Sequence, residues 1–296
     1  MGKKSTSSRE LNLSQRYRIP AGGKFRLADV DPADTGGLDK EHAKGALARG
    51  IERLDELQER LYAQDRWGVL VIFQAMDAAG KDGAIEHVMS GVNPQGVQVF
   101  SFKAPSSEEL DHDFLWRGTT RLPERGRIGI HNRSWYEEVL IVRVHPGILA
   151  GQRLPKAVLS KSIWEERLED IAAFERYLAR QGYLILKFFL HVSKEEQKRR
   201  FLARLDEPEK NWKFALGDIR EREHWDAYMK AYEAAIRATA TELAPWYVVP
   251  ADHKWFTRLV VSEAIVHAIE RLKIQWPAPA LKPEDLAAAR KALARD

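Results

Sequence analysis

Residues 74–83 read QAMDAAGKDG and place a carboxylate, a lysine and two glycines within a few positions of one another. The usual phosphate-binding loop reads GxxxxGK[ST]; its backbone N–H groups and a helix N-terminus hold phosphate while the lysine reaches the oxygens. Here Gly80 and Lys81 keep their places, Ala75 replaces the first glycine, and Asp82 replaces the hydroxyl residue that would bind Mg²⁺. These residues indicate phosphate binding by a modified loop.

Asp77 lies inside this loop and supplies a hard oxygen of the kind that Mg²⁺ prefers. We therefore expect Asp77 and Lys81 to be catalytic, with Mg²⁺ as the cofactor on Asp77 and Mn²⁺ as the other candidate metal. The remaining loop residues expected to bind phosphate are Ala78, Ala79, Gly80, Asp82 and Gly83. The alternative is an ordinary strand-to-helix turn, in which Asp82 lies near the helix start only because the helix dipole stabilises a negative charge there.

A second polar cluster, IGIHNRSWYEE, occupies residues 128–138 and follows an apolar run. It falls where a strand would end, at the carboxyl edge at which open α/β sheets bind ligands. The planar guanidinium of Arg133 suits phosphate oxygens, so we expect Arg133 and Glu137 to be catalytic, with Asn132 and Glu138 beside them. Alternatively, Arg133 only pairs with the two glutamates on a surface turn.

Apolar periodicity around these clusters alternates between short buried strands and amphipathic helices. Such alternation predicts an α/β fold, a parallel sheet with helices on both faces, which gives three layers. The predicted strands are 68–73, 97–102, 127–131, 183–190 and 246–249, and the predicted helices are 38–63, 82–90, 106–121, 157–181, 218–240 and 255–273.

The composition of the 296 residues narrows the classes of function. The absence of cysteine excludes disulfides, zinc–thiolate sites and thiol nucleophiles, and it agrees with a cytoplasmic protein. No apolar run reaches the roughly 18 residues of a membrane span. Residues 1–10 are basic and rich in serine without an apolar segment, so we expect a frayed end and not a secretory signal.

A basic segment at about residues 198–222 contains eight Lys and Arg against five Asp and Glu. A linear polyanion needs several cationic donors along a track, and a mobile arm can close over a reacting phosphate. We therefore expect a basic lid with an elbow at Pro208, although a charge run can also be a solvated face. The further residues expected to bind phosphate are Arg200, Arg204, Lys210 and Lys213 in the lid, and Lys103 and Arg117 before it.

Five motifs occur in order: QAMDAAGKDG (74–83), NPQGV (93–97), DFLWR (113–117), NRSWYE (132–137) and PEKNWKF (208–214). Together they resemble the family-2 polyphosphate kinases, over about residues 15–277. The resemblance implies a thymidylate-kinase-like P-loop fold with a helical lid. The expected organisation is an irregular segment (1–37), a P-loop kinase domain including the lid (38–277) and a C-terminal tail (278–296).

The resemblance also implies an activity, the phosphorylation of a nucleoside mono- or diphosphate by inorganic polyphosphate. Asp77, Lys81 and Arg133 match the family's functional residues, and Asn132 with Glu137 resembles the subgroup that accepts both AMP and ADP. The implied partners are polyphosphate and adenine nucleotides, with guanine nucleotides as a further option, and a homo-oligomer (dimer or tetramer). No nucleic-acid or membrane partner is expected.

Two other functions compete with this one. An ATP-dependent nucleoside monophosphate kinase would need no polyphosphate, and it would be expected to carry the Ser or Thr that Asp82 replaces. A non-enzymatic polyanion-binding protein would use the basic segment alone, which leaves the strand–loop–helix unit unexplained.

Overall fold

The computed structural model describes residues 12–294, and the basic segment 1–10 lies outside this range. Its centre is a five-stranded parallel sheet in the order β2-β3-β1-β4-β5. The strands are β1 (Gly68–Gln74), β2 (Val97–Ser101), β3 (Ile128–Asn132), β4 (Tyr183–His191) and β5 (Trp246–Pro250). The predicted parallel α/β class is therefore confirmed.

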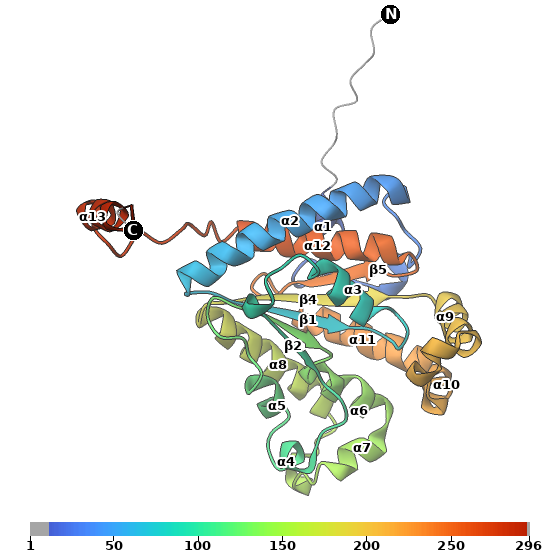
Figure 1. The fold of residues 1–296 in the computed structure, drawn as a ribbon. Helices are drawn as coiled ribbons and strands as arrows, with labels where there is room; N and C mark the ends of the chain where they lie inside the picture. The colour runs from blue at the N-terminus through green and yellow to red at the C-terminus, as the bar shows by residue number, and fades with distance from the viewer. Residues whose placement is uncertain (1–11, 295–296) are drawn as a thin grey trace, which may run out of the picture.

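Helices cover both faces of the sheet (Figure 1). One layer contains α1 (Leu13–Arg16), α2 (Lys40–Gln64), α3 (Lys81–Val88) and α12 (Lys254–Glu270). The opposite layer contains α6 (Ile141–Val144), α8 (Ile163–Arg180) and α11 (Trp225–Thr239). In the described part of the chain, no helix is both long and apolar enough to cross a membrane.

Three predicted helices are wrong in detail. Residues 106–121 form two short helices, α4 (Ser107–Leu110), which begins with a capping box at Ser106, and α5 (Trp116–Thr119). The helix predicted at 157–181 begins only at Ile163, and the one at 218–240 is divided at His224 between α10 (Leu216–Glu223) and α11. Further helices are α7 (Pro146–Gly151), α9 (Lys194–Asp206) and α13 (Pro283–Leu293), which lies away from the body in Figure 1.

The segment at residues 12–37, predicted to be irregular, has little regular structure but joins the core. Tyr17 and Ile19 are buried, and their backbone exchanges hydrogen bonds with β5, from Val248 N–H to the Tyr17 carbonyl (2.9 Å) and from Ile19 N–H to the Trp246 carbonyl (2.8 Å). Exposed sheet edges invite pairing with other chains. This segment covers the outer edge of β5.

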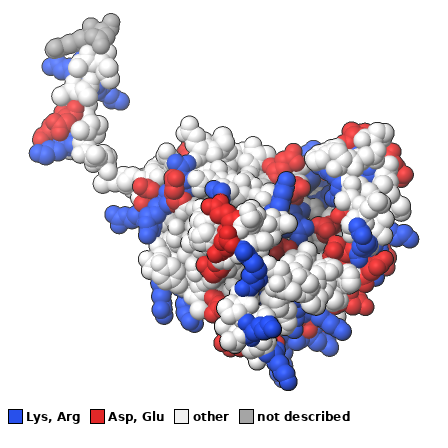
Figure 2. All heavy atoms as spheres, turned by 90° about the horizontal axis from the view of Figure 1, so that it is seen from below, with Lys and Arg blue, Asp and Glu red and all other residues white. Residues whose placement is uncertain are grey.

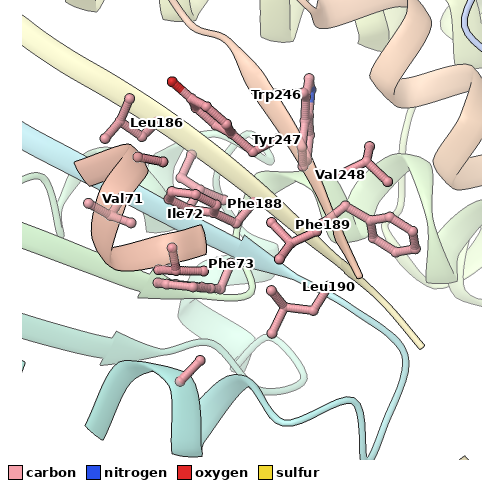
Figure 3. Packing of buried hydrophobic residues seen from close by; sticks show 14 of the residues in the cluster. Val71, Ile72, Phe73, Leu186, Phe188, Phe189, Leu190, Trp246, Tyr247 and Val248 are labelled. Carbon is pink, nitrogen blue, oxygen red and sulfur yellow. The ribbon is translucent and has the colours of Figure 1, made fainter. Parts of the chain in front are cut away.

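The central strands form a rigid core because both of their faces are buried. Every residue of β1 is buried, and the apolar side chains of β1, β4 and β5 interdigitate (Figure 3). The rings of Phe73 and Phe188 stack at 5.3 Å, and those of Phe188 and Tyr247 at 5.1 Å. Burying one such ring stabilises the fold by about 1.5–3 kcal/mol. The loop that follows β1 therefore begins from a fixed point.

A buried ion pair lies on the α8 face of the sheet. Lys187 of β4 contacts the Glu175 carboxylate, and it also donates to the Tyr136 hydroxyl (3.0 Å) and the Thr239 carbonyl (2.8 Å). Burial lowers the pKa of Lys187 and raises that of Glu175. The three ammonium donors all have acceptors, so the charge is tolerated inside the core.

We expect Lys187→Met to lower the free energy of unfolding by about 3–5 kcal/mol, because it leaves the buried Glu175 carboxylate without its cation. Urea unfolding followed by circular dichroism measures the change. The double variant Lys187→Met/Glu175→Gln should recover part of the loss, since it buries no charge. A single variant within about 1 kcal/mol of the parent would contradict this account of the pair.

Candidate active site

The phosphate-binding loop predicted from the sequence lies at the carboxyl end of β1 and leads into α3. Its residues 77–83 line a cavity of about 750 Å³. Ala78 and Gly80 adopt positive φ angles of 60° and 106°. The N–H groups of Ala78, Gly80, Lys81, Asp82 and Gly83 have no acceptor among the described residues. The loop thus offers a concave row of N–H donors for an anion.

Lys81 lies at the base of this cavity and is almost completely buried. Its ammonium donates to the carbonyls of Ala75 (3.0 Å) and Met76 (3.5 Å). Burial, with a smaller contribution from the Arg133 cation, lowers the pKa of Lys81 to about 8, while the nearby carboxylates oppose the shift. A desolvated ammonium close to another cation favours an incoming anion, because the anion neutralises both.

Asp77, Arg133 and Glu137 come together as predicted and form one ion-pair chain. Arg133 donates to Asp77 Oδ1 (2.5 Å) through one nitrogen and to Glu137 Oε2 (3.2 Å) through the other. The Glu137 carboxylate is the largest cause of the raised pKa of Arg133. The two carboxylates therefore fix the plane of the guanidinium at the edge of the cavity.

The other two residues of the second cluster have structural partners. Asn132 donates to Asp82 Oδ1 (2.6 Å) and so ties the end of β3 to the start of α3. Glu138 is buried and pairs with Arg167 (3.1 Å) while accepting from Gln152. The Glu138 carboxylate is therefore occupied by these partners and is not available to a metal ion.

The basic lid consists of α9, the 3-10 segment Pro208–Lys213 and α10, and it forms one wall of the first cavity. The lining contains ten Lys and Arg against five Asp and Glu. Figure 2 shows a hollow on the side of the lid in which blue and red atoms lie close together. The predicted lid residues in this lining include Arg204, Lys210 and Lys213.

Two cations of the first cavity were missed by the sequence analysis. Lys254 and Arg258 line this cavity one turn apart on α12, and they follow β5 by only a few residues. Burial and then the charges of Arg200, Arg258 and Lys210 lower the pKa of Lys254. Their position after the last strand, at the carboxyl edge of the sheet, was the signal that could have identified them.

Arg200 was expected to bind phosphate, and its surroundings correct this expectation. Its guanidinium donates to the carbonyls of Ala78 (3.1 Å) and Ala79 (2.7 Å), to those of Ala251 (2.6 Å) and Asp252 (3.1 Å), and to Glu196 (2.7 Å). An arginine has five N–H donors, and all five are used. Arg200 holds protein groups beneath the loop and has no donor left for a phosphate.

A second cavity, of about 490 Å³, opens beside the first. Asp77, Phe102, Lys103 and Arg133 line both cavities. Arg117, which was expected to extend the phosphate track, lines only the second cavity, where it donates to the Lys103 carbonyl (2.8 Å). The apolar walls, absent from the predicted site, comprise Pro105, Ile141, Val142, Ile148, Tyr228 and Tyr232.

The Asp77 carboxylate is a suitable ligand for a magnesium ion. One oxygen of Asp77 accepts from Arg133, and the other has no protein partner within the described range. No group of three or more His, Cys, Asp or Glu that could hold a metal occurs in residues 12–294. Mg²⁺ is commonly held by one or two carboxylates together with substrate phosphates and waters, a mode that needs no such group.

A family model described as "Polyphosphate kinase 2 (PPK2)" matches residues 37–277. The chain belongs to the polyphosphate kinase 2 family. The enzyme is 54% identical over 269 residues to the "ADP-polyphosphate phosphotransferase" of Rhodopseudomonas palustris, covering 89% of this chain and 92% of the relative. It is 47% identical over 274 residues to the "AMP/ADP-polyphosphate phosphotransferase" of Meiothermus ruber, covering 92% and 98%.

The fold agrees with this membership. The crystal structure of polyphosphate kinase 2 from Arthrobacter aurescens is similar with a TM-score of 0.88 at 42% sequence identity, covering 96% of this chain and 97% of that one. The enzyme is thus a polyphosphate-dependent nucleotide phosphotransferase with a P-loop kinase-like fold, as the motifs predicted.

We expect the affinity of the enzyme for inorganic tripolyphosphate to fall by roughly tenfold between pH 7 and about 9, because Lys81, with a pKa of about 8, loses its charge. Titration calorimetry across this range measures the change. Lys81→Arg is the control, since its guanidinium stays protonated while the ligand titrates as before. An equal fall in both proteins would assign the effect to another group.

Proposed function

We propose that this enzyme phosphorylates both AMP and ADP with inorganic polyphosphate as the donor, in a reversible reaction that forms ADP and then ATP. The observation that carries the proposal is the contact between two unlike cavities at Asp77 and Arg133. One cavity is cationic and contains the phosphate-binding loop; the other has mainly apolar walls. A phosphoryl group bound at their junction is within reach of both.

The second cavity suits the nucleotide. Its apolar and aromatic walls can enclose a base and a ribose, and Lys103 and Arg117 at its rim can hold the acceptor phosphate. Adenine agrees with the names of the two relatives above, and guanine is a second candidate base. The occurrence of Asn at position 132 together with Glu at position 137, which resembles the subgroup that accepts both AMP and ADP, supports use of both acceptors.

The first cavity suits polyphosphate. Its cations come from the loop, the lid, β3 and α12, so they surround the space instead of forming one patch. A condensed phosphate chain carries a charge at each unit and can be neutralised along its length by such a set. The lid and α12 therefore hold the chain while its end lies on the loop.

Transfer is then an in-line displacement. An oxygen of the acceptor phosphate forms a bond to the terminal phosphorus of polyphosphate, and the bond from that phosphorus to the bridging oxygen breaks. The donor leaves one unit shorter, with the electron pair on its new terminal oxygen. The acceptor phosphate has a pKa of about 6 and is largely ionised at neutral pH, so no general base is needed.

The residues contribute position and charge. The loop N–H groups and Lys81 bind the terminal units, while Arg133, oriented by Asp77 and Glu137, lies where the transferred group passes. Mg²⁺, when bound at Asp77, would add positive charge to the phosphate oxygens; Mn²⁺ is the alternative metal. An assembly of two or four chains and a cytoplasmic location stay predictions.

Incubation of AMP with long-chain polyphosphate and Mg²⁺, without ATP, tests the proposal. We expect ADP to accumulate first and ATP to follow, as measured by ion-exchange chromatography of the nucleotides. Formation of ADP alone, or conversion of ADP but not AMP, would restrict the proposal to one acceptor. No product without added ATP would favour an ATP-dependent kinase.

The matched controls are Lys81→Ala and Asp77→Ala, purified in the same way. We expect both to lose at least about a thousandfold in turnover while remaining folded, because Lys81→Ala removes a cation from the phosphates and Asp77→Ala removes the carboxylate that orients Arg133 and would hold Mg²⁺. Near-normal turnover in either would show that the site is assigned wrongly, or that a contaminating kinase forms the product.

Lys254→Ala and Arg258→Ala should each raise the KM for long-chain polyphosphate by roughly tenfold, the effect of losing one charge-assisted hydrogen bond. Both residues line only the first cavity, so kcat and the KM for AMP should change little. Lys291→Ala, on the distant helix α13, removes the same charge as a control. An equal effect of Lys291→Ala would mean that only net charge matters.

A further inference from the structure

The carbonyl groups of the phosphate-binding loop all have donors, and three consecutive ones are held by the base of the lid. Ala75 and Met76 accept from Lys81, and Gly80 accepts from Ala84 N–H (2.9 Å). Between them, Asp77 accepts from Gln197 Nε2 (2.8 Å), and Ala78 and Ala79 accept from Arg200. Carbonyls that face α9 leave the N–H groups to face the cavity.

The peptide on each side of Ala78 is fixed by this arrangement. Gln197 binds the Asp77 carbonyl, and the orientation of this peptide determines the φ angle of Ala78. Arg200 binds the Ala78 carbonyl, and the orientation of that peptide determines its ψ angle. Ala78 has a φ of 60°, a conformation that costs a non-glycine residue about 1 kcal/mol or more. Such a conformation persists only where the surroundings impose it, and here α9 imposes it.

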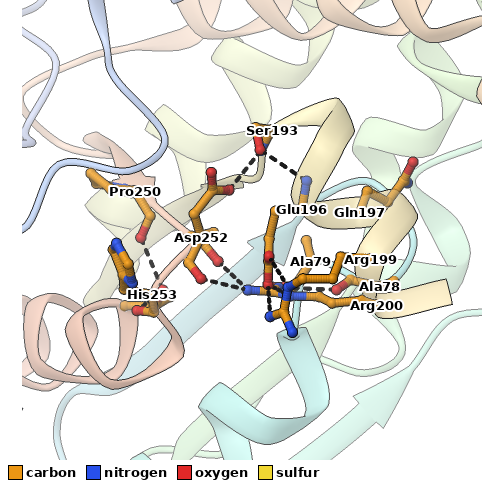
Figure 4. Close-up of polar contacts among 12 residues, drawn as sticks. Ala78, Ala79, Ser193, Glu196, Gln197, Arg199, Arg200, Pro250, Asp252 and His253 are labelled. Carbon is orange, nitrogen blue, oxygen red and sulfur yellow. Dashed lines mark hydrogen bonds and ion pairs between the residues drawn. The ribbon is translucent and has the colours of Figure 1, made fainter. Parts of the chain in front are cut away.

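Arg200 also connects the loop to the segment after β5. Its second nitrogen donates to the carbonyls of Ala251 and Asp252, and the Asp252 side chain accepts from Ser193 N–H (2.8 Å) at the start of α9 (Figure 4). Glu196 accepts from Arg200 and completes its partners. The loop, the lid base and the β5–α12 segment thus meet at one guanidinium.

We propose that Gln197 and Arg200 are positioning residues, which orient the loop peptides so that their N–H groups bind the donor phosphates. Arg200 acts through the backbone of the loop and does not touch the transferred group. Gln197 and Arg200, which together we call the clamp, lie on α9 at the base of the lid. A displacement of α9 would therefore also rotate the loop peptides. The inference rests on the proposed binding of polyphosphate by this loop.

Kinetics of Gln197→Ala, Arg200→Lys and the double variant test the proposal. Gln197 carries no charge, and a lysine keeps the charge of Arg200 but cannot make five hydrogen bonds. We expect each single variant to lose roughly tenfold or more in kcat/KM for polyphosphate. The double variant should lose little more than the worse single one, since both act on the same peptides.

Lys198→Ala is the matched control, because it removes a positive charge from the same helix, α9. The Lys198 side chain is exposed and lines neither cavity. We expect less than about a threefold effect, confined to KM and abolished by salt. The clamp would be overturned if Gln197→Ala had normal kinetics while Arg200→Lys was impaired, or if Arg200→Lys itself had normal kinetics. It would also be overturned if the losses of the two single variants added up in the double variant.

Crystal structures of Gln197→Ala and Arg200→Lys without ligand provide a readout that does not depend on activity. We expect the peptides around Ala78 to turn and its φ angle to leave the positive range. An unchanged loop would overturn the clamp even if polyphosphate is the donor. A turned loop in an enzyme that does not use polyphosphate would instead contradict the proposed function alone.

Discussion

Mutual repulsion of the cations around the loop is the constraint on which the site depends. Two unit charges 4 Å apart repel by about 4 kcal/mol at the effective dielectric of a protein surface. Burial lowers the pKa values of Lys81 and Lys254, and the repulsion from neighbouring cations lowers them further. Carboxylates and carbonyls hold the cations in place, and a bound polyanion relieves the repulsion. The folded structure therefore holds the cations together before the ligand arrives, and the site is preorganised for a highly charged phosphate donor.

Such a site needs a support that does not yield to the repulsion. The sheet provides it, because β1, β4 and β5 are buried on both faces and end at the same edge as the loop. The Lys187–Glu175 pair braces the other face by joining β4 to α8 and α11. Dense packing leaves little room for relative movement, so Arg200 and Ala78, 122 residues apart in the sequence, keep a hydrogen-bond distance at the loop.

The sequence predicted the fold class, the loop and the Asp77–Arg133–Glu137 cluster, because these depend on local patterns and on the edge at which parallel strands end. It did not predict Lys254 and Arg258, since an isolated Lys and Arg at the start of a helix resemble any solvated pair. The role of Arg200 was misjudged for a related reason. Charge and helical spacing show that an arginine lies near a phosphate site, but not that carbonyls already occupy its donors.

The departures of the loop from the usual motif also have a structural explanation. Asp82, in place of the hydroxyl residue, accepts from Asn132 and joins α3 to β3, so this position serves the framework. Ala78 takes a left-handed conformation that glycine would adopt more easily, and donors on α9 hold it there. The loop alone therefore does not specify its own shape. Its phosphate-binding geometry belongs to the loop and the lid base together, which couples the position of the lid to the state of the loop.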